Sequence, residues 1–398
     1  MVQVERGSTV RELLQLYRQG GYLQVEGCAE VCLAAISDKL AGPSTAGTGG
    51  SGSSGGSGSN MGGGGGGPDS RICPEVLELY DCIGLWPDPA TEPAFAVITA
   101  KARERLVLHF GDALTTLNTP ELRRQLLALP VEALEVLLEA DEFDTDVEDT
   151  ILLMLATWVQ ENGGAAVPAA PKRQRLLEQA PGKRNLQATW FSTRPRRPCL
   201  LAATSGGNGT LPSGSSGQQQ MRRPTFEWSI SQEELERGLR GLQPGGAMHL
   251  ECTLANGLNG ISARGFEWRA SINYKHGAEA AGLFLRCHLP AAYRLDTAAL
   301  GSPLAALAQV GARVEADRWR NGAREVTRDY AYVVSDFIGV GTGRGVPSAL
   351  PLKRGGEGTA GGGGGRGGSQ RGSLRAWSEY IHGGKITGRL VLLPLAGR

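Results

Sequence analysis

The sequence lacks the signatures that would assign it to an enzyme class or to a membrane. Only five of its 398 residues are histidine, and they are scattered along the chain. No nucleophile elbow of the Gly-x-Ser-x-Gly type stands between an expected strand and helix, the glycines of 339–345 miss dinucleotide-loop spacing, and Gly384-Lys385 lacks the following Ser or Thr of a Walker A loop. No apolar run approaches the length of a membrane span. We therefore expect no enzyme, no catalytic residue, no cofactor and no membrane partner.

Strong charge of one sign and paired cysteines are also missing. The net charge of +1 steers the chain toward neither nucleic acid nor an acidic surface. The seven cysteines show no paired spacing, and the segment Val2–Val10 is too polar for a signal peptide, so we expect reduced thiols in the cytoplasm or nucleus. Cys28 and Cys32 lie one helical turn apart, but no second pair closes a metal site, which favours burial in a core.

Two further motifs have a functional and a structural interpretation. Residues 144–149 resemble the start of a calcium loop, but Asp149 stands where the sharp-turn glycine is needed, so a capped helix start is preferred. The basic clusters 172–175 and 194–197 would suit nuclear import or phosphate binding, but a solvated basic linker is the preferred interpretation, because such clusters are common. The segment 365–372 is similar to RNA-binding RGG repeats but has no interleaved aromatics.

Glycine, by contrast, is abundant, with 59 residues, many of them in runs. The segments 41–67 and 341–372 are low in apolar side chains, and 164–224 is basic. Such compositions cannot offset the conformational entropy that ordering costs. We therefore expect two disordered linkers, 41–67 and 164–224, and a disordered Gly-rich insert at 341–372.

Between the linkers, residues 68–163 carry helical periodicity and a net charge of −13. Apolar residues recur there at three- and four-residue spacing, and proline marks the start of several of these stretches. The pattern predicts four or five short helices, which would form a bundle. The segment from Leu126 to Glu161 is expected to hold two of them, with Thr145 and Glu148 forming a capping box for the second. Residues 1–40 are predicted to form another helix pair, the first opened by a capping box of Thr9 and Glu12.

The C-terminal part, 225–398, changes to period-2 alternation. Turns such as Asn259-Gly260 and Asn321-Gly322 separate the alternating runs, which predicts an antiparallel β-sandwich with one helix from Glu233 to Leu242. The expected strands are 226–230, 248–254, 265–274, 283–289, 312–319, 330–338 and 385–393. The aromatics at strand positions are expected to be mostly core, with one or two free to line a ligand groove: Trp228, Phe266, Trp268, Trp319, Tyr330 and Trp377.

Several residues resemble a known family in their order. The sequence Leu129-Pro130, the leucines 134, 137 and 138, then Asp141, Glu148 and Trp158 resemble the helical BACK module of BTB-BACK proteins. Tyr22–Cys32 is similar to the closing helix pair of a BTB domain whose earlier part is absent from this sequence. Phe266–Arg269, Leu283–Leu285 and the ending around Trp377 and Tyr380 are similar to MATH (TRAF-type) sandwiches. The overall order is similar to that of green-algal and plant BTB/BACK proteins.

This resemblance implies a non-enzymatic substrate adaptor of a cullin-three RING ubiquitin ligase. Its partners would be the cullin scaffold, expected on a surface of helix 74–85 with Val76, Leu77 and Tyr80, and a protein substrate held by the β domain. Nucleic acid is not expected as a partner. Homodimerisation is not expected either, because the dimer-forming part of the BTB domain is missing. The alternative is a BACK and β-sandwich scaffold that binds peptides or RNA with no role in ubiquitination.

Overall fold

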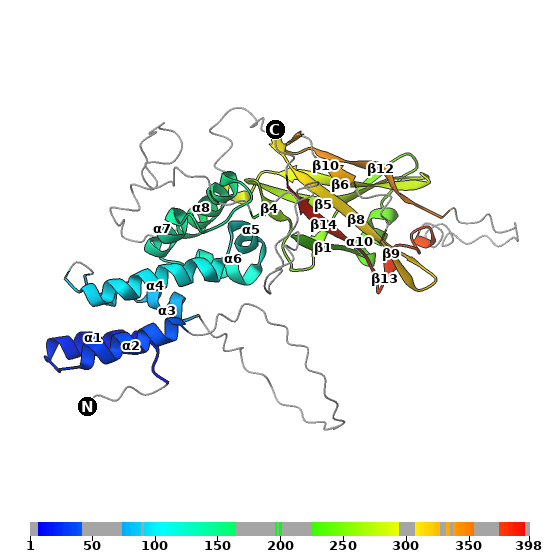
Figure 1. The fold of residues 1–398 in the computed structure, drawn as a ribbon. Helices are drawn as coiled ribbons and strands as arrows, with labels where there is room; N and C mark the ends of the chain where they lie inside the picture. Colours follow the sequence, from blue (N-terminus) through cyan, green and yellow to red (C-terminus); the bar gives the residue numbers. More distant parts are fainter. Residues whose placement is uncertain are drawn as a thin grey trace, which may run out of the picture. The chain divides into compact units, whose positions relative to one another are not determined.

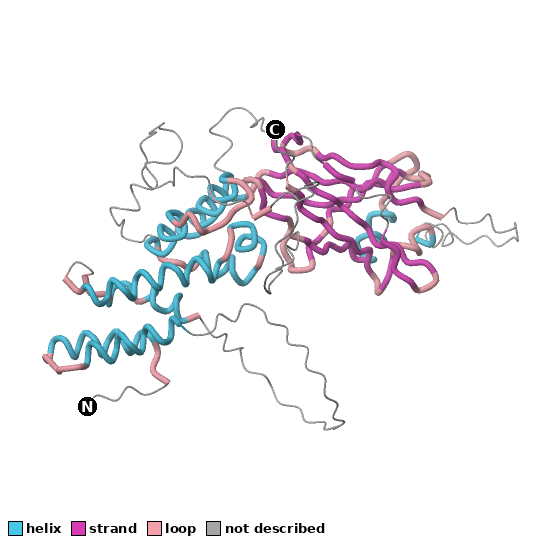
Figure 2. The backbone as a smooth tube through the Cα atoms, in the orientation of Figure 1, coloured by secondary structure: helices cyan, strands magenta, loops and turns pink. Residues whose placement is uncertain are grey.

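Helices form the N-terminal half of the chain and antiparallel β-sheets form the C-terminal half, as predicted (Figures 1 and 2). The computed structural model describes residues 7–41, 74–88, 91–163, 196, 199–200, 224–293, 307–326, 332–334, 337–353 and 374–394. The chain divides into two compact units: unit 1 comprises Met1–Gly111, Ala128–Phe143 and Val167–Arg194, and unit 2 comprises Asp112–Leu127, Asp144–Ala166 and Pro195–Arg398. The predicted linkers 41–67 and 164–224 lie almost entirely outside the described residues.

Unit 1 is helical. Its described elements are α1 (Val10–Tyr22), α2 (Cys28–Ala41), α3 (Glu75–Asp81), the 3-10 turn η1 (Ile83–Leu85), α4 (Pro93–Phe110) and α7 (Val131–Glu139). Helix α1 begins with the predicted capping box, in which the Thr9 hydroxyl accepts from the Glu12 amide and the Glu12 carboxylate accepts from the Thr9 amide. Glu78 of α3 accepts from the next two amides, those of Val10 and Arg11. A carboxylate at this end also suits the helix dipole.

An apolar and aromatic core holds the unit 1 helices together. Tyr17 packs against Phe95, and Trp86 packs between Phe95 and Tyr80, with ring centroids 5.3–6.4 Å apart. The Tyr17 hydroxyl donates to Glu92 at 2.8 Å, so both ends of the phenol ring are held. Burial, together with this hydrogen bond, raises the pKa of Tyr17 to about 12.

Helices also form part of unit 2. They are α5 (Ala113–Asn118), α6 (Pro120–Leu127), α8 (Glu148–Gly163) and α10 (Gln232–Arg240). Asp112 caps α5, a helix that periodicity alone did not predict, by accepting from the Thr115 amide at 2.7 Å. Helix α10 begins with a capping box of Ser231 and Glu234. The helices expected in one bundle over 68–163 thus belong to both units; the domain boundary at residue 163 itself stays a prediction.

The strands of unit 2 form two large antiparallel sheets and a small one. The seven-stranded sheet has the order β10-β8-β14-β1-β3, with β9 and β13 beside β8 and β14. Its strands are β1 (Thr225–Ser231), β3 (Thr253–Leu254), β8 (Gly311–Arg320), β9 (Ala323–Val326), β10 (Tyr332–Val334), β13 (Ile381–His382) and β14 (Lys385–Leu393). Strand β1 pairs with β14 over its whole length, so the first and last strands of unit 2 lie side by side in this sheet.

The five-stranded sheet carries the candidate site. Its order is β12-β6-β5-β2, with β4 beside β5. Its strands are β2 (Ala247–Glu251), β4 (Ile261–Ala263), β5 (Phe266–Lys275), β6 (Ala280–His288) and β12 (Gly343–Pro351), and the two-stranded sheet pairs β7 (Leu307–Gln309) with β11 (Phe337–Gly339). One face of each large sheet contributes to a single hydrophobic cluster, in which Trp228, Trp268 and Trp377 are at most 1% exposed.

Polar side chains fix α5 and α8 to the sheets of unit 2. The Asn118 side chain donates to the carbonyl of Ser262 on β4 at 2.7 Å and accepts from the Ser262 amide at 2.8 Å. Just before α8, Asp146 accepts from the Arg264 amide at 3.0 Å. Because these bonds satisfy backbone groups of β4 and of Arg264, which directly follows it, the helices are integral parts of the β unit.

Three local predictions are wrong. Residues 343–351 of the predicted Gly-rich insert form strand β12, because Gly343 and Gly345 let this strand approach β6 more closely than a Cβ would allow; the insert's remainder, 354–372, lies outside the described residues. Arg196, expected in a solvated linker, is 5% exposed and forms an ion pair with Glu148 at 2.6 Å. The capping box at Thr145 is absent, since α8 begins at Glu148 and the Thr145 hydroxyl donates to the Val147 carbonyl.

Candidate functional site

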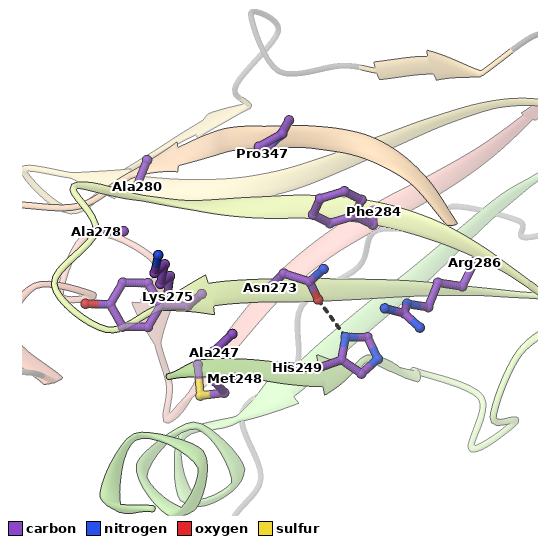
Figure 3. Close-up of a pocket in the computed structure, with 11 residues that line it drawn as sticks. Ala247, Met248, His249, Asn273, Lys275, Ala278, Ala280, Phe284, Arg286 and Pro347 are labelled. Carbon is purple, nitrogen blue, oxygen red and sulfur yellow. Dashed lines mark hydrogen bonds between the residues drawn. The ribbon is translucent and has the colours of Figure 1, made fainter. Parts of the chain in front are cut away.

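The candidate site is a hollow on the outer face of the five-stranded sheet. Alternate residues of β5 and β6 turn away from the hydrophobic cluster, and there they enclose a volume of about 340 Å³ (Figure 3). We call it the outer-face groove. The lining side chains that could contact a ligand are His249, Asn273, Lys275, Phe284, Arg286 and Pro347, and small alanines lie between them.

Glycines create the hollow. Gly282 pairs with Asn273 on one side, and Gly345 pairs with Phe284 on the other. A Cβ at Gly282 would lie 2.5 Å from Cε2 of Phe284, and one at Gly345 would lie 2.6 Å from Cδ1 of the same ring. The phenyl ring therefore lies over positions that have no side chain, and it forms an apolar platform in the groove.

The polar groups of the groove are basic or neutral. Nδ1 of His249 lies 2.6 Å from Oδ1 of Asn273, and Lys275 follows on the same strand, β5. Nε of Arg286 is buried and has no hydrogen-bond partner among the described residues. Figure 3 shows its guanidinium extending toward the His249–Asn273 pair. None of the described residues that line the groove is acidic. Its electrostatic character is therefore positive.

Two carboxylates on this face, Glu251 and Glu267, are paired with Arg269 rather than with Arg286. Arg269 forms ion pairs with Glu251 and Glu267, each at 2.6 Å. Burial opposes ionisation of Glu251, but the hydrogen bond and charge of Arg269 outweigh it and lower the pKa of this carboxyl. His288 lies 3.6 Å from Glu251, and burial together with the charge of Arg269 lowers the pKa of its imidazole. Among the described residues, neither carboxylate forms an ion pair with Arg286.

The groove offers a ligand an apolar ring and hydrogen-bonding groups. In the described part of the chain, no three His, Cys, Asp or Glu side chains gather in a way that would hold a metal ion. Cys28 and Cys32 are buried, and burial together with Cys28 raises the pKa of Cys32 to about 11, so the Cys32 thiol is not activated. Among the described helices, none combines the length and the apolarity that a membrane crossing requires.

The residues singled out by sequence are mostly core residues. Val76, Leu77 and Tyr80 of α3 are 5%, 6% and 3% exposed. That these residues bind a partner stays a prediction. It requires their buried side chains to become exposed. Of the family-motif positions, Leu129 and Trp158 are buried, Pro130 precedes α7, Asp141 is exposed and Glu148 pairs with Arg196. They lie in two units, with Leu129, Pro130 and Asp141 in unit 1.

The groove residues were not predicted from sequence. Of the strand aromatics expected in the core, Trp228, Trp268 and Trp377 are buried there, Trp319 stacks on His382 at 3.6 Å, and Tyr330 lies outside the described residues. The groove uses Phe284 instead. The available signal was the alternation of 280–288, where Gly282, Phe284 and Arg286 share the face opposite to Leu283 and Leu285.

Comparison with known proteins assigns no family to this arrangement. The chain matches no protein-family model, and no curated protein is significantly similar to it. The resemblance to BTB, BACK and MATH domains therefore stays a prediction from the order of the residues, and the function has to be argued from the groove.

Proposed function

We propose that this protein is a non-enzymatic adaptor that holds a segment of a partner protein in the outer-face groove. The observation that carries the proposal is the hollow itself, in which the Phe284 platform adjoins polar groups with unused hydrogen-bonding capacity. Pockets of about 300–1,000 Å³ that combine apolar walls with a few polar groups are typical of specific binding sites.

The second part of the proposal is that the helical residues link this capture to a cullin-three RING ubiquitin ligase. It is supported by the resemblance of positions 129–158 to a BACK module, with the β unit as a MATH-type sandwich that receives the substrate. The acidic stretch 68–163, with its net charge of −13, would also favour fast association with a basic partner surface.

The test of the ligase part titrates the purified cullin-three scaffold into the full-length protein and follows binding by calorimetry. We expect binding that weakens as salt is added, because the proposed attraction is partly electrostatic. A lack of binding at every accessible concentration would overturn this part. The chain would then be a peptide-binding scaffold without ubiquitin machinery, which is the second candidate function and requires only the groove.

The test of the capture part uses crosslinking and mass spectrometry on the full chain and on Phe284→Ala. We expect partners that crosslink to the five-stranded sheet and are lost in Phe284→Ala. The exposed Arg344 on β12 does not line the groove, so Arg344→Gln is the matched control and should retain them. Partners that bind both variants equally would place capture elsewhere on the protein.

A further inference from the structure

The shape of the groove does not by itself explain the position of Arg286. Its stem lies over Gly343, since a Cβ there would be 2.9 Å from Cγ of Arg286, and its buried Nε has no hydrogen-bond partner among the described residues. Leaving a buried donor of a charged group unsatisfied is costly. A planar guanidinium offers its donors as a fork whose geometry matches a carboxylate.

We propose that the groove selects an extended peptide that carries an acidic side chain, and that Arg286 binds its carboxylate. This inference rests on the binding role proposed for the groove and adds the chemistry of the occupant. The charges of the described residues favour it: Lys275 is a second cation of the groove, no lining residue is acidic, and the neighbouring Glu251 and Glu267 are both paired with Arg269.

The register of β6 also predicts the spacing within the peptide. Phe284 and Arg286 are two residues apart on one face, which corresponds to about 6.6 Å along a strand. An extended peptide repeats its side chains on one face at the same interval. An apolar side chain against the Phe284 ring therefore places the residue two positions away at the guanidinium. The preferred sequence is an apolar residue, any residue, then Asp or Glu, in either chain direction.

The experiment selects binders from a displayed library of random nine-residue peptides, using the full-length protein as bait. We expect enrichment of peptides with Asp or Glu two positions from Leu, Ile or Phe. The best peptide, labelled with fluorescein, is then titrated and followed by anisotropy. Arg286→Gln should weaken its binding by about tenfold or more, and replacing the peptide's acidic residue by its amide should have the same effect. Arg344→Gln, at an exposed arginine of the same sheet, should leave binding unchanged.

A charge exchange guards against a variant that merely fails to fold. Arg286→Glu should lose the acidic peptide and bind the version in which Lys replaces the acidic residue, which an unfolded protein could not do. Reversal of both charges without recovery of binding would count against a direct contact between Arg286 and the carboxylate.

The remaining outcomes separate the two proposals. The selected peptides could show no preference for an acidic residue and still require Phe284 for binding. This result would support the groove as a peptide site and would overturn the proposed role of Arg286. Peptides that bind independently of Phe284 and Arg286, or no selected peptides at all, would overturn both. A labelled oligouridine that binds the full chain and is lost in Arg286→Gln would assign this face to RNA and would equally overturn the inference.

Discussion

The two units of this protein differ in what they bury. Every side chain in the described residues that is both polar or charged and buried belongs to unit 2, including Asn118, Arg196, Arg264, Asp317 and Glu379. The described core of unit 1 is made of apolar and aromatic residues on helix faces, with polar contacts such as Tyr17–Glu92 at its margin. An apolar core tolerates changes of similar volume, whereas a buried polar group costs free energy whenever its partner is removed.

The comparison has a structural cause. Helices satisfy their own backbone groups, so unit 1 needs few side chains for that purpose. In unit 2, short strands and helix ends meet in the interior, and side chains complete their backbone hydrogen bonding, as Asn118 does for Ser262 and Asp146 does for the Arg264 amide. The predictions below test this difference, beginning with the largest expected effect.

Gly388→Ala should destabilise unit 2 most. Its Cβ would collide with the Glu315 carbonyl and with the ring of Trp228, which is 1% exposed, in the centre of the seven-stranded sheet. We expect a loss of about 4 kcal/mol in the free energy of unfolding. Hydrogen exchange followed by mass spectrometry should show lost protection in the sheets and also in α5, α6 and α8, while α1 to α4 keep theirs.

The control for this substitution is Gly21→Ala in α1, where a Cβ would meet nothing within 4 Å. Alanine stabilises a helix interior by about 0.5–1 kcal/mol relative to glycine, so this variant should be neutral or slightly more stable. If Gly388→Ala left α5, α6 and α8 protected, these helices would not be integral to the β unit.

Asn118→Ala should have the next largest effect. It removes the side-chain bonds to Leu114 and Ser262 and leaves buried backbone groups of β4 without partners. The expected cost is about 3 kcal/mol, measured by urea unfolding. Asn256→Ala removes two bonds of an exposed side chain, one donated to the Asn118 carbonyl and one accepted from the Leu258 amide, and should cost about 1 kcal/mol. Equal effects of the two variants would contradict the importance of burial.

Acidification should weaken unit 2 through Glu379. Burial raises the pKa of this carboxyl, but hydrogen bonds and charges from Lys353 and Arg318 outweigh burial and hold the pKa below its usual value of 4.5. The stability that Glu379 supplies is complete above about pH 4.5 and is lost as the pH falls through the lower pKa of the folded state. Thermal unfolding between pH 3 and 6 should show a weaker pH dependence for Glu379→Gln than for the unaltered protein.

Unit 1 supplies the opposite case. Asp81 of α3 is an exposed residue, but partial desolvation of its carboxyl raises its pKa, so ionisation slightly destabilises the folded state and protonation relieves this small cost. Asp81→Asn should therefore stabilise unit 1 at neutral pH. The unaltered protein gains stability in acid when Asp81 is protonated, and the variant should not show this gain. In unit 2, burial likewise raises the pKa of Asp146, which partly offsets the acid sensitivity due to Glu379.

Exposed ion pairs should give the smallest effects and should not distinguish the units. Arg103 of unit 1 lies 3.9 Å from Glu139, and Arg124 of unit 2 lies 2.6 Å from Glu121, with all four side chains 41–58% exposed. Arg103→Ala and Arg124→Ala should each change the free energy of unfolding by about 0.5 kcal/mol or less, as measured by urea unfolding. A larger loss in either variant would reveal packing by the arginine stem.

Local sequence signals predicted the elements well where neighbouring residues decide them. The Thr9–Glu12 capping box is present, and β14 spans the predicted 385–393. The signals misjudged Thr145 and Glu148, because Glu148 pairs with Arg196, 48 residues away, rather than with its neighbour. They also missed β12, since its glycines are typical of a loop in isolation and become useful only beside β6.

The sequence by itself determined that helices come first and strands follow, and which faces most of them bury, because periodicity and caps act over a few residues. Only the tertiary structure decided which unit each helix joins and where the groove lies. Asn118 and Ser262 are 144 residues apart, and Gly345 leaves space for Phe284 only when β12 aligns with β6. Contacts of this kind depend on which segments meet in space, and no local pattern specifies that.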